Sequence, residues 1–384
     1  MGGVDAFRRN TEVMRVPLER RESGTREASA FGVYVHVPFC VHKCDYCAFA
    51  TWTDRAHLID AYMDALRRQA AAAAATMPPV DTVFVGGGTP SLVAAEQLTA
   101  VLDELPLAAG AEVSIECNPD TVDVELFEAY RAHGVDRISL GVQSMVPHVL
   151  DALGRTHDPD NVAAAVAAAR AAGIPRLNLD LIYGGAGESL GDWERTLVDA
   201  VALEPDHVSA YALTIEPGTG LADDPSRHPD DDDQAEKYLA ADAALTAAGL
   251  SNYEISNWAR PGEECRHNLL YWTGGDYLGL GCAAHSHVNG RRFWSVRTPD
   301  RFIAAIDGGT SVEAGSEQLD AETRSVELLQ LQVRLRDGVP AATVPDEVRH
   351  LVDVGDDGRA RLTLDGRLLA NEVAVRLDPS GARP

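Results

Sequence analysis

Short apolar runs alternate with longer amphipathic stretches along most of the chain from Val33 onward. Six runs of four to six residues, rich in Val, Ile and Leu, have the pattern of buried strands: 33–37, 82–85, 112–115, 137–142, 177–182 and 207–211. Helices are predicted near 54–75, 91–104, 122–133 and 160–172. This alternation predicts right-handed βαβ units and a parallel sheet, either doubly wound or rolled into a full or partial barrel.

Polar or glycine-rich residues follow each predicted strand. In chain order they are three cysteines, Gly86–Pro90, Glu116–Pro119, Gln143, Asp180 with Tyr183–Gly185, and Thr214–Gly218. Functional groups at the carboxyl ends of all strands are typical of the catalytic face of a barrel. Because there are six units, we predict an α/β fold, a partial (β/α)6 barrel that stays open.

The pattern changes after the sixth strand. An acidic run over 223–233 is interpreted as a solvated loop before a helix near 234–249, and 251–295 is rich in aromatic residues, Gly and His. An amphipathic helix near 320–335, a strand at 359–364 and a final helix at 366–377 predict a small C-terminal α+β domain of winged-helix-like shape. We therefore divide the chain into a flexible extension (1–28), the barrel (29–225), an extension of the barrel (226–305) and the C-terminal domain (306–384).

The chain has 384 residues and a formal net charge of −26. No stretch approaches the roughly 20 apolar residues of a membrane span, and residues 1–28 lack the apolar core of a secretory signal. We therefore expect a cytoplasmic protein. Nucleic-acid binding is not expected, because an acidic surface repels phosphate and the arginines of the last domain, Arg359, Arg361, Arg367 and Arg376, form no basic stripe.

Three of the six cysteines, Cys40, Cys44 and Cys47, fall within eight positions directly after the first predicted strand. Their Cys-x3-Cys-x2-Cys spacing supplies three thiolates from one loop, and Phe39 and Tyr46 beside them would exclude water from a soft metal centre. The pattern favours a [4Fe–4S] cluster whose fourth iron binds an exchangeable small molecule.

Two other interpretations of the cysteines remain open at this stage. A structural zinc site normally has a fourth protein ligand, which Cys117, His36 or His42 could supply. A set of redox-active thiols is the second alternative.

The other strand ends suit a polar ligand with an amino acid moiety. Glycines at 86–88 allow backbone N–H groups to come close to such a ligand, and Thr89-Pro90 suits the start of a helix. Glu116 could bind an ammonium or ribose hydroxyls, and Gln143, Arg155 and Asp180 could bind further polar groups. Taken singly, each is also compatible with a tight turn, a cap or a salt bridge.

Several segments together resemble the radical S-adenosylmethionine (SAM) superfamily, and within it the family that contains oxygen-independent coproporphyrinogen III oxidases and HemW-type haem chaperones. The segments include YVHVPFCVHKCDYCAF, FVGGGTPSL, SIECNPD, ISLGVQSM, NLDLIYGG and YLGLGCAAHS, and the resemblance covers roughly 31–380. It implies a [4Fe–4S] cluster held by the three cysteines. It also implies SAM binding by Tyr34, Tyr46, Gly87, Gly88, Thr89, Glu116, Gln143, Arg155 and Asp180.

One departure separates the two branches of this family. The oxidases carry a further cysteine two residues after the third cluster ligand, where this chain has Phe49, and only about 30 residues precede the first strand here. Both features favour the chaperone branch. In that branch the segment HNLLYW matches a motif linked to haem, which implies haem binding by His267, Asn268, Tyr271 and Trp272.

The haem motif also has a structural interpretation. An imidazole can bind haem iron, and the aromatic residues can cover a porphyrin. Alternatively, His267 is a hydrogen-bonded core residue and the aromatic side chains join the barrel to the last domain. Cys265, His285 and His287 are other candidate ligands.

Two functions from different classes follow. The first is a haem chaperone that holds a [4Fe–4S] cluster, SAM and haem, and delivers haem to an acceptor protein, which the family suggests is a membrane-bound respiratory enzyme. The alternative is an oxidase in which the reduced cluster cleaves SAM and the 5′-deoxyadenosyl radical abstracts a propionate hydrogen of coproporphyrinogen. Whether the chain is an enzyme, and whether it forms a homodimer, stays open.

Overall fold

The computed structural model describes residues 30–382, so the predicted extension at 1–28 lies outside the described residues. Six parallel strands form the centre of a 12-stranded sheet. They are β1 (Phe31–Val37), β2 (Val80–Gly87), β3 (Leu107–Cys117), β4 (Arg137–Gln143), β5 (Arg176–Tyr183) and β6 (His207–Ala212). All six predicted strands are therefore present and in the predicted order.

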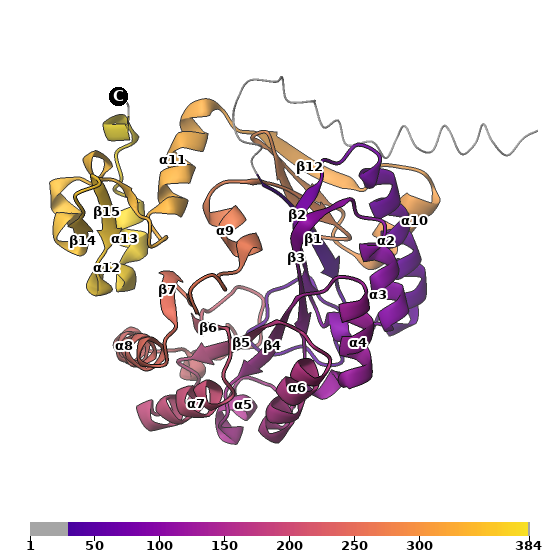
Figure 1. The fold of residues 1–384 in the computed structure, drawn as a ribbon, viewed down its shortest axis with the longest axis horizontal. Coiled ribbons are helices and arrows are strands. Elements are labelled where there is room, and N and C mark those ends of the chain that lie inside the picture. The colour runs from indigo at the N-terminus through magenta and orange to yellow at the C-terminus, as the bar shows by residue number, and fades with distance from the viewer. Residues whose placement is uncertain (1–29, 383–384) are drawn as a thin grey trace, which may run out of the picture.

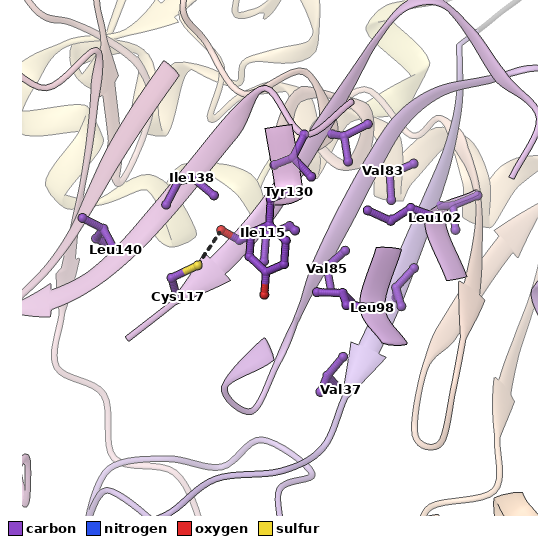
Figure 2. Close-up of a cluster of buried hydrophobic side chains, with 14 of the residues drawn as sticks. Val37, Val83, Val85, Leu98, Leu102, Ile115, Cys117, Tyr130, Ile138 and Leu140 are labelled. Carbon is purple, nitrogen blue, oxygen red and sulfur yellow. Dashed lines mark hydrogen bonds between the residues drawn. The ribbon is translucent and has the colours of Figure 1, made fainter. Parts of the chain in front are cut away.

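Helices cover the outer face of this curved sheet (Figure 1). They are α2 (Ile59–Ala74), α3 (Ala95–Leu102), α4 (Val124–Ala132), α5 (Pro147–Ala152), α6 (Pro159–Ala171), α7 (Leu190–Ala202) and α8 (Asp231–Ala247). Figure 2 shows the core that forms beneath them, where Val83, Ile115 and Leu140 of three neighbouring strands lie in one cluster with Leu98 of α3 and Tyr130 of α4. Small residues of α2, among them Ala65 and Ala70, are fully buried and allow this helix to lie close to the strands.

The segment after α8 extends both edges of the sheet, which the pattern of hydrophobic positions did not predict. At one edge β8 (Asn257–Ala259) and β7 (Ser251–Glu254) follow β6; at the other, β9 (Asp276–Leu280) pairs with β1, followed by β10 (His285–Val288), β11 (Arg291–Ser295) and β12 (Glu313–Gln318). The sheet is open, because its order begins at β12 and ends at β7. The fold is thus the predicted α/β partial barrel.

Two helices of this region lie on opposite sides of the sheet. The short helix α9 (Arg266–Trp272) lies on the concave side, against β1 and β2, whereas α10 (Pro299–Asp307) packs beside α2 on the outside (Figure 1). The inner face of the barrel is therefore partly filled by a segment that comes after all six central strands.

The C-terminal region has its own small core. Helix α11 (Ala321–Gln332) leads to a three-stranded antiparallel sheet of β13 (Val339–Pro340), β15 (Arg359–Leu362) and β14 (Val352–Val354). The predicted single helix at 366–377 is wrong: α12 (Leu364–Leu368) and α13 (Ala370–Ala374) are separate, because Leu369 leaves the helical conformation with φ −109° and ψ 26°.

Strand pairing also bears on the division of the chain. Our division started the last domain at 306, but β12 belongs to the large sheet, so the change from one core to the other comes after Gln318. The division as a whole stays a prediction. Among residues 30–382, no helix is both long and apolar enough to cross a membrane.

Candidate functional site

The three clustered cysteines lie in one loop at the carboxyl end of β1. Backbone hydrogen bonds fold this loop back on itself: the N–H of Cys40 donates to the carbonyl of Trp52 (3.2 Å), and that of Cys47 donates to the carbonyl of Cys44 (3.1 Å). All three thiols are free and partly exposed. One loop therefore presents three sulfur atoms at the edge of the barrel.

The surroundings of these sulfur atoms suit thiolates bound to metal. Burial raises the pKa of the Cys40 and Cys47 thiols, so without a bound metal both are neutral thiols at pH 7. The hydroxyl of Thr89 donates to Sγ of Cys40 (3.7 Å), and Nη1 of Arg155 donates to Sγ of Cys44 (3.6 Å). Both donors stabilise a thiolate, and bound iron ions supply the positive charge that removes the thiol protons.

The structure gives the zinc alternative no fourth ligand. Cys117 points into the apolar core, where its Sγ donates to the carbonyl of Ile115 (3.9 Å; Figure 2). Both ring nitrogens of His36 are engaged, with the hydroxyl of Tyr34 (3.0 Å) and the carbonyl of Ala50 (2.9 Å), and His42 is exposed. Within the described chain, no three His, Cys, Asp or Glu side chains come together closely enough for a single metal ion. An iron–sulfur cluster, in which each cysteine binds a different iron, fits this wider spacing.

The glycine run after β2 is packed against the cysteine loop. A Cβ on Gly88 would lie 2.5 Å from the carbonyl oxygen of Phe39, and one on Gly87, at φ +111°, would lie 2.3 Å from the ring of His36. Two of the amides that we expected to face a ligand are used inside the protein: Gly88 N–H donates to Val37 (2.8 Å) and Gly87 N–H donates to Glu116 (3.1 Å). The absence of side chains at Gly87 and Gly88 therefore allows the cysteine loop to lie close to the end of β2.

Two carboxyl groups lie together on the concave side of the sheet. Burial, with the nearby charge of Asp180, raises the pKa of Glu116 to about 7. Burial also raises the pKa of Asp180, which accepts hydrogen bonds from Ser139 (2.5 Å) and Asn178 (2.9 Å). Because burial destabilises the charged form of both groups, an ammonium group or hydroxyls of a bound ligand would stabilise it.

Gln143 and Arg155 approach the same region from the end of β4. Gln143 has a positive φ of 64°, which is uncommon for a residue other than glycine, and it lies at an irregularity in the pairing of β4 with β5. Such strain is concentrated at functional sites. Nη2 of Arg155 donates to the carbonyl of Gly141 (2.9 Å), so one guanidinium links β4 to the cysteine loop.

Of the predicted tyrosines, Tyr34 belongs to β1 and Tyr46 lies within the cysteine loop. Burial raises the pKa of Tyr34 and of Tyr46, so both stay neutral and can donate hydrogen bonds. Tyr46 packs beside a small apolar cluster that includes Val149 and Leu153. The structure thus brings the predicted cluster and SAM residues to one end of the barrel.

Sequence analysis missed the residues that fix the cysteine loop by hydrogen bonds from the segment 221–227. Nη2 of Arg227 donates to Asp45 (2.7 Å) and to the carbonyl of Ala152 (2.6 Å), and the carbonyl of Asp45 accepts from the N–H of Leu221 (2.9 Å). Arg227 belongs to the run that we interpreted as a solvated loop. Its basic side chain among many acidic ones was the available signal.

The haem motif forms α9, and its histidine is buried at 1% exposure. Nδ1 of His267 is hydrogen-bonded to the hydroxyl of Thr82 (2.9 Å), and Nε2 is hydrogen-bonded to the hydroxyl of Tyr271 (2.8 Å). Burial lowers the pKa of His267 to about 3, so the imidazole is neutral. In this conformation neither ring nitrogen is available to a metal.

A buried carboxylate fixes the start of α9, and sequence analysis missed it. Glu112 of β3 has no exposed surface and accepts from the N–H groups of Arg266 (3.2 Å) and His267 (3.0 Å). It also accepts from the thiol of Cys265 (3.6 Å) and pairs with Arg176 (3.2 Å). This helix therefore depends on a strand about 150 residues earlier.

The other members of the motif face two directions. Nδ2 of Asn268 donates to the hydroxyl of Tyr253 (3.1 Å), and the guanidinium of Arg334 lies over the ring of Trp272 at 5.8 Å. Tyr271 instead lines a cavity of about 670 Å³ at the carboxyl end of β1, together with Tyr34, Phe49, Tyr277 and Trp294. Only one residue of the motif thus reaches a space that could hold a large ligand beside the cysteine loop.

Comparisons with known proteins agree with this geometry. Residues 34–200 match the radical SAM superfamily. The chain is 45% identical to the haem chaperone HemW of Mycobacterium tuberculosis over 94% of this chain and 98% of that protein, and 37% identical to HemW of Escherichia coli over 84% and 89%. Its fold is similar to that of the coproporphyrinogen III oxidase HemN of Escherichia coli, with a TM-score of 0.78, 22% identity, and coverage of 90% and 89%.

Proposed function

We propose that this chain, which belongs to the HemW family of haem chaperones within the radical SAM superfamily, binds haem and transfers it to an acceptor protein. The identity of 45% over nearly the whole length of a named haem chaperone carries this proposal. The similarity to the oxidase HemN, at 22% identity, bears on the fold alone.

The cysteine loop would hold the [4Fe–4S] cluster through Cys40, Cys44 and Cys47. When bound, such a cluster supplies a redox-active centre with one iron open to SAM. Arg155 and Thr89 would stabilise the thiolates from two sides, as their contacts of 3.6 and 3.7 Å with sulfur indicate.

SAM would lie beside the cluster, over the carboxyl ends of β2–β5. Glu116 and Asp180 would bind its polar groups, because their carboxyl groups lie near each other and Glu116 accepts a hydrogen bond from Gly87, in the glycine run that packs against the cysteine loop. The remaining residues proposed for this site are Tyr34, Tyr46, Gly87, Gly88, Thr89, Gln143 and Arg155.

The haem site would include the motif 267–272. Tyr271 lines the cavity next to the cysteine loop, so a haem bound there would lie close to the cluster. We further propose that the acceptor is a membrane-bound respiratory enzyme, and that a homodimer is one form of the protein. An acidic chain of net charge −26 would reach such an acceptor through the protein and not through anionic lipid.

The test combines haem binding with an assay for the alternative activity. The cluster is reconstituted without oxygen, haem is titrated into the protein, and the Soret band is followed. Coproporphyrinogen is incubated in parallel with the same protein, SAM and a reductant. Stoichiometric haem binding with unconverted coproporphyrinogen is expected, whereas decarboxylation without haem binding would make the chain an oxidase despite Phe49.

A further inference from the structure

The cavity of about 670 Å³ beside the cysteine loop has walls suited to a flat apolar ligand. They come from β1, the segment 48–50 directly after Cys47, α9, β9 and the hairpin of β10 and β11. Phe49 is 65% exposed, which is unusual for so large an apolar side chain. The volume lies within the roughly 300–1,000 Å³ of small-molecule sites, and aromatic walls offer a macrocycle large contact areas.

One histidine of this cavity has its ring nitrogens available. His285, the first residue of β10, is exposed, and its imidazole has no hydrogen-bond partner within residues 30–382. Its ring stacks on Trp294, with centroids 5.8 Å apart and planes inclined by 26°. His36 also lines the cavity, but both of its nitrogens are engaged. An imidazole nitrogen that no protein group occupies is free to bind haem iron, as the axial histidine of many haem proteins does.

The turn that precedes His285 has a strained backbone. Ala283 lines the cavity and has a positive φ of 56°, although it is not glycine. Two hydrogen bonds hold it there: Ala283 N–H donates to Val296 (2.9 Å), and Ser295 N–H donates to Ala284 (3.0 Å). Strain that the surrounding structure maintains is concentrated at binding sites, and here it fixes where His285 begins its strand.

Two arginines of the cavity have no acidic partner. Neighbouring arginines form ion pairs, which are Arg55–Asp300 (3.2 Å), Arg68–Asp307 (2.6 Å) and Arg291–Glu313 (2.5 Å). Arg297 and Arg301 line the cavity, are exposed, and form no ion pair with any residue that the structure describes. In a chain with 59 acidic and 33 basic residues, two unpaired guanidinium groups at one cavity indicate an anionic ligand.

We propose that this cavity is the haem site, with His285 as an axial ligand of the iron and with Arg297 and Arg301 binding the two propionates. The proposal rests on the proposed function, because it assumes that the chain binds haem. It makes His267 a positioning residue, which holds the hydroxyl of Tyr271 (2.8 Å) and thereby orients one wall of the cavity.

Haem titration of the full chain tests the ligand. His285→Gly is expected to weaken haem binding by about tenfold or more and to shift the Soret band, and added imidazole should restore the wild-type spectrum. His267→Ala should weaken binding but keep the wild-type ligation spectrum. His148→Ala, on the exposed face of α5, is the matched control and should change neither.

The outcomes separate the inference from the proposed function. If the wild type binds haem and His285→Gly binds it with unchanged affinity and spectrum, the assignment of His285 is wrong. If His267→Ala loses the ligation signal instead, His267 is the ligand. If the wild type binds no haem, the proposed function fails before the inference is reached.

A second titration tests the arginines. The double variant Arg297→Ala and Arg301→Ala is compared with wild type for haem and for its dimethyl ester, which lacks the propionate charges. We expect the variant to bind haem about tenfold more weakly than wild type and to bind the ester with little change in affinity. The reason is that free propionates form charge-assisted hydrogen bonds with arginine and their methyl esters do not. Equal affinities of variant and wild type for haem, or equal losses for both ligands, would contradict the propionate assignment.

Discussion

The cysteine loop and helix α9 carry the two most distinctive segments of the sequence, but their polar atoms differ in availability. The three thiols are partly exposed, and the contacts with Thr89 and Arg155 that stabilise them are long. In α9, His267 is buried, its N–H is bound to Glu112, and its ring is bound to Thr82 and Tyr271.

This difference shows that a distinctive sequence motif does not always supply atoms that are free to bind a ligand. A loop with available donor atoms at the end of a strand is ready to bind a metal. A helix whose histidine is fully hydrogen-bonded instead builds the wall of a site, and the atoms that contact the ligand can come from another segment. Around the cavity beside Phe49, that other segment is the hairpin of β10 and β11.

The largest expected effect concerns the cysteine loop. Cys44→Ala should reduce the iron and sulfide content after reconstitution from nearly stoichiometric to close to none, because the cluster loses one of three ligands. Far-UV circular dichroism should stay unchanged, since Cys44 is partly exposed. Cys117→Ala is the matched control and should keep its iron, because this thiol faces the core. Equal iron in the two variants would remove the distinction between the two regions.

The next effect concerns the attachment of α9. Glu112→Ala should lower the free energy of unfolding by about 3–5 kcal/mol, because it removes the buried acceptor of two backbone N–H groups and one of the two carboxylates, Glu112 and Asp136, that pair with Arg176. Glu104→Ala, which breaks the partly exposed pair with Arg67 (2.8 Å), should cost no more than about 1 kcal/mol. Urea unfolding of the metal-free protein measures both. A small loss for Glu112→Ala would mean that α9 is held by other contacts.

Acid should destabilise the α9 region through His267. Its pKa is about 3 in the folded protein and about 6.5 when unfolded, so below pH 6.5 the unfolded chain binds a proton that the folded chain does not. Stability therefore falls as pH decreases from 6.5 towards 3, by about 1.4 kcal/mol per pH unit for this group.

A comparison of wild type with His267→Asn isolates that contribution. The stability difference between the two should narrow by about 2 kcal/mol between pH 7.5 and pH 5, because the variant lacks the titrating ring. The packing loss of the variant is the same at both pH values and cancels. A pH-independent difference would show that His267 is already accessible to protons, and hence to a ligand.

The central strands were predictable from sequence because their signal is local. The apolar runs around Val83, Ile138 and Leu179 are each buried within one strand, and the structure extends them by only a few residues. β7–β12 were not predicted, since they are short and acquire their order from pairing with distant strands. The break between α12 and α13 depends on the conformation of one residue, which helical periodicity does not reveal.

The residues of the candidate site were also predictable only where their signal is local. The cysteines directly follow β1, and Glu116 and Asp180 lie near the carboxyl ends of β3 and β5, so strand order alone indicated that they would meet at one end of the barrel. Glu112 could not be recognised as a partner of α9, because a carboxylate at the start of an apolar run is also typical of an exposed strand end. Two of the hydrogen bonds that occupy His267, with Thr82 and Glu112, come from β2 and β3, and no pattern within its own segment predicts them.

The smallest effect concerns Glu116 and has the opposite sign to that of His267. Its pKa is about 7 in the folded protein and about 4.5 when unfolded, so between these values the folded chain binds the extra proton. Stability therefore falls as pH rises from 4.5 to 7, and Glu116→Gln, which cannot ionise, escapes this loss.

Because Glu116 is partly exposed, we expect the variant to gain only about 1 kcal/mol relative to wild type between pH 5 and pH 8 in metal-free protein. The measurement is urea unfolding at both pH values, with Glu104→Gln, at a partly exposed carboxylate away from the site, as the control. Two results together would establish the difference between the regions: Glu116→Gln is more stable than wild type at pH 8, and wild type loses stability at pH 5 through His267. The carboxyl group beside the cysteine loop would then be kept for a ligand, and the neutral imidazole of α9 would be kept for structure. A relative stability of Glu116→Gln that does not change with pH would mean that Glu116 ionises freely and that the two regions do not differ in this respect.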